Sequence, residues 1–220
     1  MDVAAFDYDG TLTHGGSVFG FLSALAGRPA VVVSSLALAP QLAHAALVGG
    51  DSADRTKERL FQRVMGGTTI ERLEAVAAGY GREHVSRHLR ADVGDRLDWH
   101  RKRGDRVVVV SASPEVYVRE AADCLGVDGV IATRLEVAAD GSVTGRYDGA
   151  NCRGAEKLRR LRLWIEASGQ APVRIWCYGN SRGDLVMLRA ADVGVNVGRL
   201  GRLGALRAYP GLHRAGPEAA

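Results

Sequence analysis

Two carboxylates lie two residues apart near the start of the chain, in the segment Asp7-Tyr8-Asp9-Gly10-Thr11. The apolar residues 3–6 come directly before them and predict a buried strand that ends in a polar turn. Two carboxylates in an irregular turn can converge on one site. There one can attack as a nucleophile while the other moves protons, because their surroundings can separate their pKa values.

Three later segments carry polar groups that suit a phosphate or a cation. Ser111 follows four valines, and a hydroxyl with backbone N–H groups at a strand-to-helix turn suits phosphate. Lys157 is one of only three lysines and lies near the start of a predicted helix. Asn180 and Asp184 offer oxygen ligands four residues apart. A divalent cation and a lysine would offset the repulsion between an anionic nucleophile and an anionic phosphate. Mg²⁺ prefers such oxygen ligands, and these segments hold no cluster of His or Cys.

The elements that position these residues alternate between strands and helices. Apolar, β-branched runs at 107–110, 173–178 and, more weakly, 193–197 predict parallel strands covered on both faces. Helical patterns follow at 114–126, 154–168 and 184–191, which predicts an α/β fold with the polar segments at the carboxyl edge of its sheet. A turn at 139–142 between two short apolar runs predicts a hairpin.

Two details of these helices can be predicted as well. Pro114 suits the first position of its helix, with Ser113 as the cap. In the helix at 154–168 the leucines and the isoleucine repeat at helical spacing, so we expect Arg159, Arg160 and Arg162 to face outward.

Residues 15–103 show helical patterns and no convincing strand. The segments 56–65 and 70–76 are amphipathic, and 85–103 is expected to be helical too. We therefore predict an all-helical insertion over 15–103, with a catalytic core formed by residues 1–14 and 104–220.

An uncharged stretch at 29–50 lies inside this insertion. It contains no Asp, Glu, Lys or Arg, and Arg28 is the only charged residue between positions 15 and 50. It is long enough to span a bilayer, but a proline, a glutamine and a histidine interrupt it. Three interpretations stay open: a buried or partly exposed helix, a helix at the membrane surface or re-entrant in it, and a spanning helix. A spanning helix would need an awkward topology, because the later segments must lie on the same side of the membrane as Asp7.

The four polar segments, in this order, resemble the motifs of the haloacid dehalogenase superfamily, and in particular its phosphoserine-phosphatase-like branch, subfamily IB. The resemblance covers essentially the whole chain. It implies a Rossmann-like three-layer sandwich with a parallel central sheet and an inserted helical cap. It also implies a phosphatase or a phosphotransfer enzyme, because dehalogenases of the superfamily lack the second aspartate and transport ATPases carry Thr there.

The resemblance also implies a role for each matching residue. Asp7 would be the nucleophile that forms an aspartyl-phosphate, and Asp9 the general acid that later activates water. Ser111 and Lys157 would contact the phosphate and neutralise charge. The remaining implied contacts are to phosphate through Gly10, Thr11 and Ala112, and to Mg²⁺ through Asp7, the backbone carbonyl of Asp9, Asn180 and Asp184.

Three positions depart from the family pattern. Asn180 stands where the family often has Asp, and a neutral ligand should weaken metal binding. This keeps open a protein that retained the fold as a binding module and lost catalysis. Gly183 and Gly16 stand where phosphoserine phosphatases carry an Asn for the phosphoryl group and a Glu for the substrate amine, so phosphoserine is disfavoured.

Composition limits the remaining choices. The chain has 220 residues, of which 46% are hydrophobic and 25% charged, which excludes a disordered chain. Its three cysteines form no CxxC pair, so we expect a reducing compartment and no structural zinc. The chain shows no secretory signal ahead of Asp7, so we expect a cytoplasmic protein.

The net charge of +4 comes almost entirely from arginine and fits either anionic ligands or GC-rich codon usage. The arginines are scattered among few aromatics, which argues against nucleic acid.

The substrate should be selected by the insertion. We predict an Mg²⁺-dependent phosphomonoester hydrolase that acts on a soluble metabolite phosphate. The alternative is a lipid phosphate of the phosphatidylglycerophosphate kind, because the apolar segment 15–50 favours an amphiphilic substrate and contact with a membrane surface.

Overall fold

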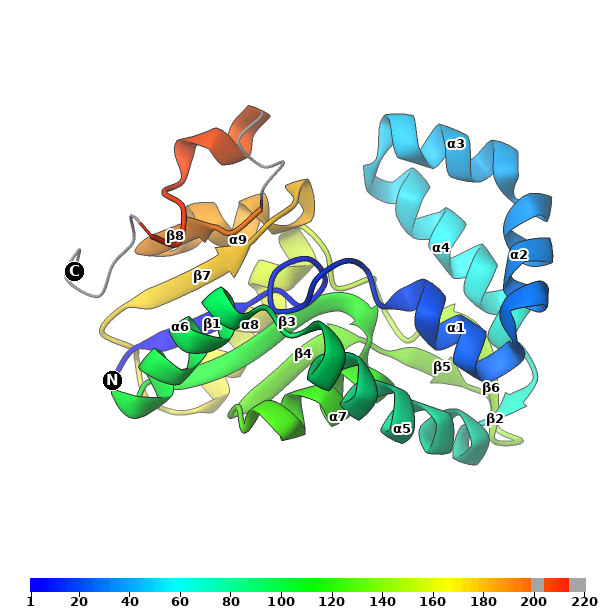
Figure 1. The fold of residues 1–220 in the computed structure, drawn as a ribbon, viewed down its shortest axis with the longest axis horizontal. Helices are drawn as coiled ribbons and strands as arrows, with labels where there is room; N and C mark the ends of the chain where they lie inside the picture. Colours follow the sequence, from blue (N-terminus) through cyan, green and yellow to red (C-terminus); the bar gives the residue numbers. More distant parts are fainter. Residues whose placement is uncertain (199–203, 214–220) are drawn as a thin grey trace.

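A parallel sheet of five strands forms the centre of this computed structural model, which describes residues 1–198 and 204–213 (Figure 1). The strand order is β4-β3-β1-β7-β8. The runs at 3–6 and 107–110 are confirmed as strands, and so is most of each run at 173–178 and 193–197. The fifth strand, β4, was not predicted. The bounds are β1 (Val3–Phe6), β3 (Arg106–Pro114), β4 (Gly129–Thr133), β7 (Ile175–Gly179) and β8 (Val193–Asn196).

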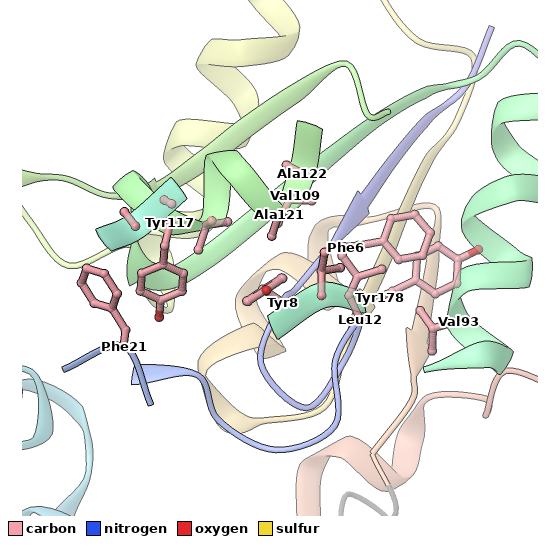
Figure 2. Close-up of a cluster of buried hydrophobic side chains, with 14 of the residues drawn as sticks. Phe6, Tyr8, Leu12, Phe21, Val93, Val109, Tyr117, Ala121, Ala122 and Tyr178 are labelled. Carbon is pink, nitrogen blue, oxygen red and sulfur yellow. The ribbon is translucent and has the colours of Figure 1, made fainter. Parts of the chain in front are cut away.

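Side chains of the sheet alternate between two hydrophobic layers. Ala4 and Phe6 face one layer, which holds buried residues of α5 (Ile70–His88), α6 (Ala91–Lys102) and α7 (Glu115–Leu125). Val3 and Ala5 face the other layer, which holds residues of α8 (Ala155–Ala167) and α9 (Leu185–Ala190). In the first layer the ring of Phe6 stacks on Tyr178 from the neighbouring strand, with centroids 4.3 Å apart (Figure 2). The predicted α/β sandwich is thus confirmed. The predicted core residues 199–203 and 214–220 lie outside the described residues.

The helices after the sheet strands are α7 (Glu115–Leu125), α8 (Ala155–Ala167) and α9 (Leu185–Ala190). Two local predictions about them were wrong. Ser113 does not cap α7, because β3 continues through Pro114 and the Ser113 hydroxyl donates to Asp9 instead. Arg160 does not face outward, because its guanidinium donates to the backbone carbonyls of Ala132 and Ala150.

A second, small antiparallel sheet has the order β2-β6-β5. The predicted hairpin is confirmed as β5 (Leu135–Val137) and β6 (Ser142–Tyr147). Its third strand is β2 (Thr68–Thr69), which pairs with Val143 and Ser142. The expectation of an all-helical insertion was therefore wrong at this point. A strand of two residues is too short to produce a periodic pattern, and only its partner from the hairpin defines it.

Six helices make up the rest of the segment between β1 and β3. The predicted helix over 85–103 is broken, because the chain extends at Leu89 and Arg90, whose backbone N–H donates to Leu12 O. The last helix, α6, packs on the sheet, where His100 is hydrogen-bonded to the Tyr178 hydroxyl at 2.8 Å. The bounds are α1 (Val18–Ala26), α2 (Arg28–Ala37), α3 (Ala39–Val48), α4 (Gly50–Met65), α5 (Ile70–His88) and α6 (Ala91–Lys102).

The uncharged stretch at 29–50 does not form one helix. It is divided between α2 and α3, which are separated at Leu38. In the part of the chain that the structure describes, no single helix is long and apolar enough to cross a membrane. Helices α1 and α2 pass that test only as a pair, and they are bent by 119° at their junction. The spanning helix considered for this stretch is therefore not formed.

Candidate active site

Lys157, on α8, bridges two buried carboxylates at the carboxyl end of the sheet. Its Nζ donates to Asp7 Oδ1 at 2.6 Å and to Asp184 Oδ1 at 2.7 Å. Asp7 directly follows β1, and Asp184 ends the short 3-10 turn η1 (Arg182–Asp184) that follows β7. Because β1 and β7 are parallel neighbours, their ends meet at one edge of the sheet. The hydroxyl of Thr11 donates to the other oxygen of Asp7 at 2.9 Å.

One ammonium group therefore faces two carboxylates in a buried site. Burial and, second, the negative charge of Asp184 raise the pKa of Asp7 to about 7, against the opposing effect of Lys157. Burial also acts to raise the pKa of Asp184, but Lys157 and the hydrogen bonds from Ser181 outweigh it, so this pKa is lowered. With both carboxylates ionised the site carries more negative than positive charge, and Asp7 is the carboxylate whose ionisation this excess opposes.

The turn after β7 is built tightly around Asp184. Its Oδ2 accepts hydrogen bonds from the backbone N–H of Asn180 and Ser181 and from the Ser181 hydroxyl. The side-chain amide of Asn180 lies against Gly10, where a Cβ atom would stand 2.0 Å from Asn180 Nδ2. Gly10 also has a φ of +78°, which side-chain-bearing residues rarely adopt. The glycine is therefore required both by the backbone turn and by the approach of Asn180.

The second carboxylate of the first segment has different surroundings. Asp9 Oδ1 accepts the backbone N–H of Ser17 at 2.6 Å, and its Oδ2 accepts the hydroxyl of Ser113. Asp9 is partly exposed, whereas Asp7 is buried. The two carboxylates are thus held by separate partners, as expected for groups with separate tasks.

Ser111 and Ala112 follow the apolar run of β3, next to β1 in the sheet. The Ser111 side chain is buried, and its Oγ accepts the backbone N–H of Ser113 at 3.0 Å. The Ala112 carbonyl accepts hydrogen bonds from Lys57 Nζ at 2.7 Å and from the Thr133 hydroxyl at 2.8 Å. This end of β3 is therefore held by two side chains.

Lys57 was missed in the sequence, although it is one of three lysines and lies on a segment recognised as amphipathic. It extends from α4 to the carbonyl of Ala112 near the end of β3, and its Nζ lies 5.7 Å and 5.6 Å from the ring centroids of Phe61 and Tyr147. Burial lowers its pKa to about 8, against the opposing effects of Asp54 and Asp9. No local pattern in the sequence predicts this contact, because 55 residues separate Lys57 from Ala112.

A second missed residue, Asn151, completes this arrangement. Its Oδ1 accepts from Lys57 and Thr133, and its Nδ2 donates to Asp54 on α4 at 2.7 Å. The inserted segment is thus joined by hydrogen bonds to Ala112 near the end of β3 and to the loop after β6, and Thr133 of β4 joins the same network.

Of the residues predicted for the site, four form one hydrogen-bonded cluster: Asp7, Thr11, Lys157 and Asp184. Asn180 bonds Asp184 and lies against Gly10, Ala112 belongs to the Lys57 network, and Ser113 links Asp9 to Ser111.

The donor set at the edge of β1 and β7 fits a hard cation. It offers only oxygen ligands, and the excess negative charge on Asp7 and Asp184 favours a divalent ion. Within residues 1–198 and 204–213, no group of three or more His, Cys, Asp or Glu side chains is arranged to hold a metal. A cation here would therefore need the amide oxygen of Asn180 or backbone carbonyls in addition to the carboxylates.

Residues 4–189 match a family described as haloacid dehalogenase-like hydrolase. The chain belongs to this family of hydrolases. It is 35% identical to the protein CicA of Caulobacter vibrioides over 86% of this chain and 83% of that protein. It is 31% identical to a histidinol-phosphatase of Neisseria meningitidis over 52% of this chain and 53% of that protein.

The haloacid dehalogenase-like fold is also visible in solved structures. The solved structure of a phospho-aspartyl intermediate analogue of phosphoserine phosphatase superposes on this chain with a TM-score of 0.63. The match covers 89% of this chain and 85% of that one at 19% identity, and it therefore concerns the fold alone. Within this family the chain has the fold of the phosphoserine-phosphatase-like members.

Proposed function

We propose that this hydrolase is an Mg²⁺-dependent phosphatase that removes phosphate from a soluble metabolite phosphate through an aspartyl-phosphate. The observation that carries the proposal is the pair of carboxylates with different surroundings. Asp7 is buried against Lys157, whereas Asp9 is partly exposed and held by Ser17 and Ser113. One is restrained for attack, and the other is available for proton transfer.

In the first step, a carboxylate oxygen of Asp7 attacks phosphorus, and the bond from phosphorus to the ester oxygen breaks. Asp9, as the acid, gives its proton to the leaving oxygen, so the product leaves as an alcohol. In the second step, Asp9 takes a proton from water while that water attacks phosphorus, which releases inorganic phosphate and restores Asp7. Lys157 and Thr11 hold Asp7 in a fixed orientation throughout.

The remaining residues would bind the phosphoryl group and the cation. We assign Ser111, Ala112, Gly10 and Thr11, with Lys157, to the phosphate. Asp7, Asp184, Asn180 and the backbone carbonyl of Asp9 would hold Mg²⁺. When bound, the cation would offset the repulsion between Asp7 and the phosphate. Lys57, from the inserted segment, would act by positioning Ser111 and Ala112 at the end of β3.

Two observations bear on the substrate. The name of one similar protein, a histidinol-phosphatase, points to a phosphate ester of a small alcohol, which supports a soluble metabolite phosphate here. A lipid phosphate is a second candidate, because α2 and α3 expose Val33, Leu36 and Leu47.

The test is the Asp7→Asn variant, assayed with Mg²⁺ against a panel of soluble and lipid phosphate monoesters. We expect phosphate release to fall at least about a thousandfold, because the nucleophile is lost. Lys157 stays paired with Asp184, so the fold should persist, and circular dichroism serves as the control. Unchanged turnover in the variant would disprove the nucleophile. Absence of turnover in the wild-type protein on the whole panel would instead favour a binding protein that lost catalysis.

A further inference from the structure

Helices α2 and α3 form an outer surface of the inserted segment, at the end of the molecule away from the N-terminus (Figure 1). Large apolar side chains are exposed on both helices. On α2, Val33 and Leu36 are 65% and 68% exposed, and on α3, Leu47 and Val48 are 87% and 62% exposed. We call these four residues, together with the partly exposed Val32, the α2–α3 surface.

Single exposed apolar residues are ordinary, but this concentration is not. The α2–α3 surface lies on two consecutive helices in a stretch without any charged residue from 29 to 50. Each helix has few buried anchors: Val31 in α2 and Ala45 in α3. Most of the apolar area of these helices is therefore left in contact with water.

Cationic side chains border this surface. Arg55 and Arg59, both exposed on α4, line a hollow of about 370 Å³ together with Pro40, Gln41 and His44 of α3. Arg28 is exposed at the start of α2. Within the hollow, Gln41 Oε1 is buried without a hydrogen-bond partner, so it can accept a hydrogen bond from a ligand hydroxyl. The combination of apolar side chains and neighbouring arginines suits a partner with an anionic outer layer over an apolar interior.

We propose that the α2–α3 surface docks this protein on membranes that contain anionic lipids. The apolar side chains would enter the interface between headgroups and acyl chains. Arg55 and Arg59 would contact lipid phosphates, with the hollow beside α3 receiving a headgroup. Helices of ten residues each, bent against their neighbours, would lie on the membrane and not cross it. This inference does not depend on the proposed phosphatase activity.

A second copy of the chain fits this surface less well than a membrane. A twofold interface through this surface would bring the arginines of both copies, Arg28, Arg55 and Arg59, to one interface, and the accumulated like charge opposes such a contact. An anionic membrane instead attracts the same arginines.

The experiment is co-sedimentation of the full chain with vesicles of equimolar phosphatidylglycerol and phosphatidylcholine, compared with phosphatidylcholine alone. We expect binding to the anionic vesicles that weakens as salt is raised, because salt screens the arginines. The Val33→Glu/Leu36→Glu variant should reduce the partition coefficient at least about tenfold. The Arg55→Gln/Arg59→Gln variant should reduce it about fivefold for each arginine.

Matched controls are available elsewhere on the chain. Leu163→Glu/Val173→Glu places the same two charges at apolar residues that are 49% and 74% exposed outside the α2–α3 surface. Arg162→Gln/Arg189→Gln removes two exposed arginines outside the hollow. Both control variants should bind vesicles nearly as well as the wild-type protein. Circular dichroism of each variant checks that it is folded.

Three outcomes would overturn the proposal. The first is equal sedimentation with anionic and neutral vesicles, and the second is an equal effect of the surface variants and their controls. The third is a dimer in light scattering without lipid that Val33→Glu/Leu36→Glu dissociates, which would make the surface an interface between copies. Vesicle binding requires no turnover, so loss of the proposed activity would leave this result unaffected.

Discussion

The ammonium group of Lys157 lies 2.6 Å from Asp7 Oδ1 across 150 residues of sequence, in a site where both side chains are buried. Lys157 also pairs with Asp184, so a single cation holds the ends of β1 and η1 together. The same contact that restrains the proposed nucleophile therefore contributes to the stability of the sheet edge.

This relationship predicts that Lys157→Met will destabilise the protein. The substitution leaves Asp7 and Asp184 buried without a counter-charge, and we expect a loss of about 3 to 5 kcal/mol in the free energy of unfolding. Urea unfolding in the presence of EDTA measures it. Lys102→Met, at an exposed lysine on α6, is the matched control and should change stability by no more than about 0.5 kcal/mol.

A double variant tests the cause of that loss. Adding Asp7→Asn to Lys157→Met removes one of the two uncompensated carboxylates, so part of the lost stability should return. If the two substitutions were simply additive, the buried charges would not be the reason for the effect.

Lys57 predicts a pH dependence of catalysis. Its pKa is lowered to about 8, mainly by burial, and its protonated form donates to Ala112 and Asn151 beside the proposed phosphate site. In the wild-type protein kcat/KM should decline above pH 8, as the amine loses its charge. In Lys57→Arg this decline should move to higher pH, because arginine does not titrate there.

Removing the amine of Lys57 while keeping an aliphatic side chain should also lower activity. For Lys57→Met we expect kcat/KM to fall about tenfold to a hundredfold at neutral pH, because the end of β3 at Ser111 and Ala112 loses a restraint. Lys102→Met again supplies the control. If kcat/KM declines above pH 8 in the same way in the wild-type protein and in Lys57→Arg, the decline belongs to another titrating group.

Asn180 predicts a change in cation affinity. In Asn180→Asp an additional negative charge joins Asp7 and Asp184, so the Mg²⁺ concentration for half-maximal activity should fall about tenfold. Calorimetric titration with Mg²⁺ gives the same comparison without substrate. Equal Mg²⁺ affinity in both proteins would place the cation away from Asn180.

His100 predicts a loss of stability on acidification. It is fully buried, with Nδ1 bonded to Asp105 and Nε2 to the Tyr178 hydroxyl. Burial lowers its pKa to about 4, against the opposing effect of Asp105. In the unfolded chain His100 therefore binds a proton near pH 6.5, whereas in the folded chain it binds a proton only near pH 4. The contribution of His100 to the free energy of unfolding is complete above pH 6.5 and is lost as the pH falls toward 4.

At pH 5 the effect of His100 should reach about 2 kcal/mol relative to neutral pH. Urea unfolding of wild type and His100→Gln at pH 7 and pH 5 measures it, and the variant should lose correspondingly less stability on acidification. A parallel decline in both proteins would assign the acid sensitivity to other groups.

Much of the fold followed from the local pattern. The apolar runs before Asp7 and Ser111 are buried strands between two layers of helices, and such strands have a composition that is visible in the sequence. The hairpin was predictable because its turn residues lie next to each other. The two-residue strand at 68–69 and the break at Leu89 depend on contacts with residues far along the chain, and no local pattern reports them.

The sequence by itself determined which residue types are available for chemistry, because strand ends and turns are local features. Asp7, Asp9, Ser111, Lys157 and Asp184 could all be selected in this way. Only the tertiary structure decided which partner each one has. Ser113 binds Asp9 instead of capping a helix, and Lys57 reaches Ala112 from the inserted segment. The physical reason is that hydrogen bonds and ion pairs depend on distance in space, and strand order, which brings distant segments to one edge, is not a property of any single segment.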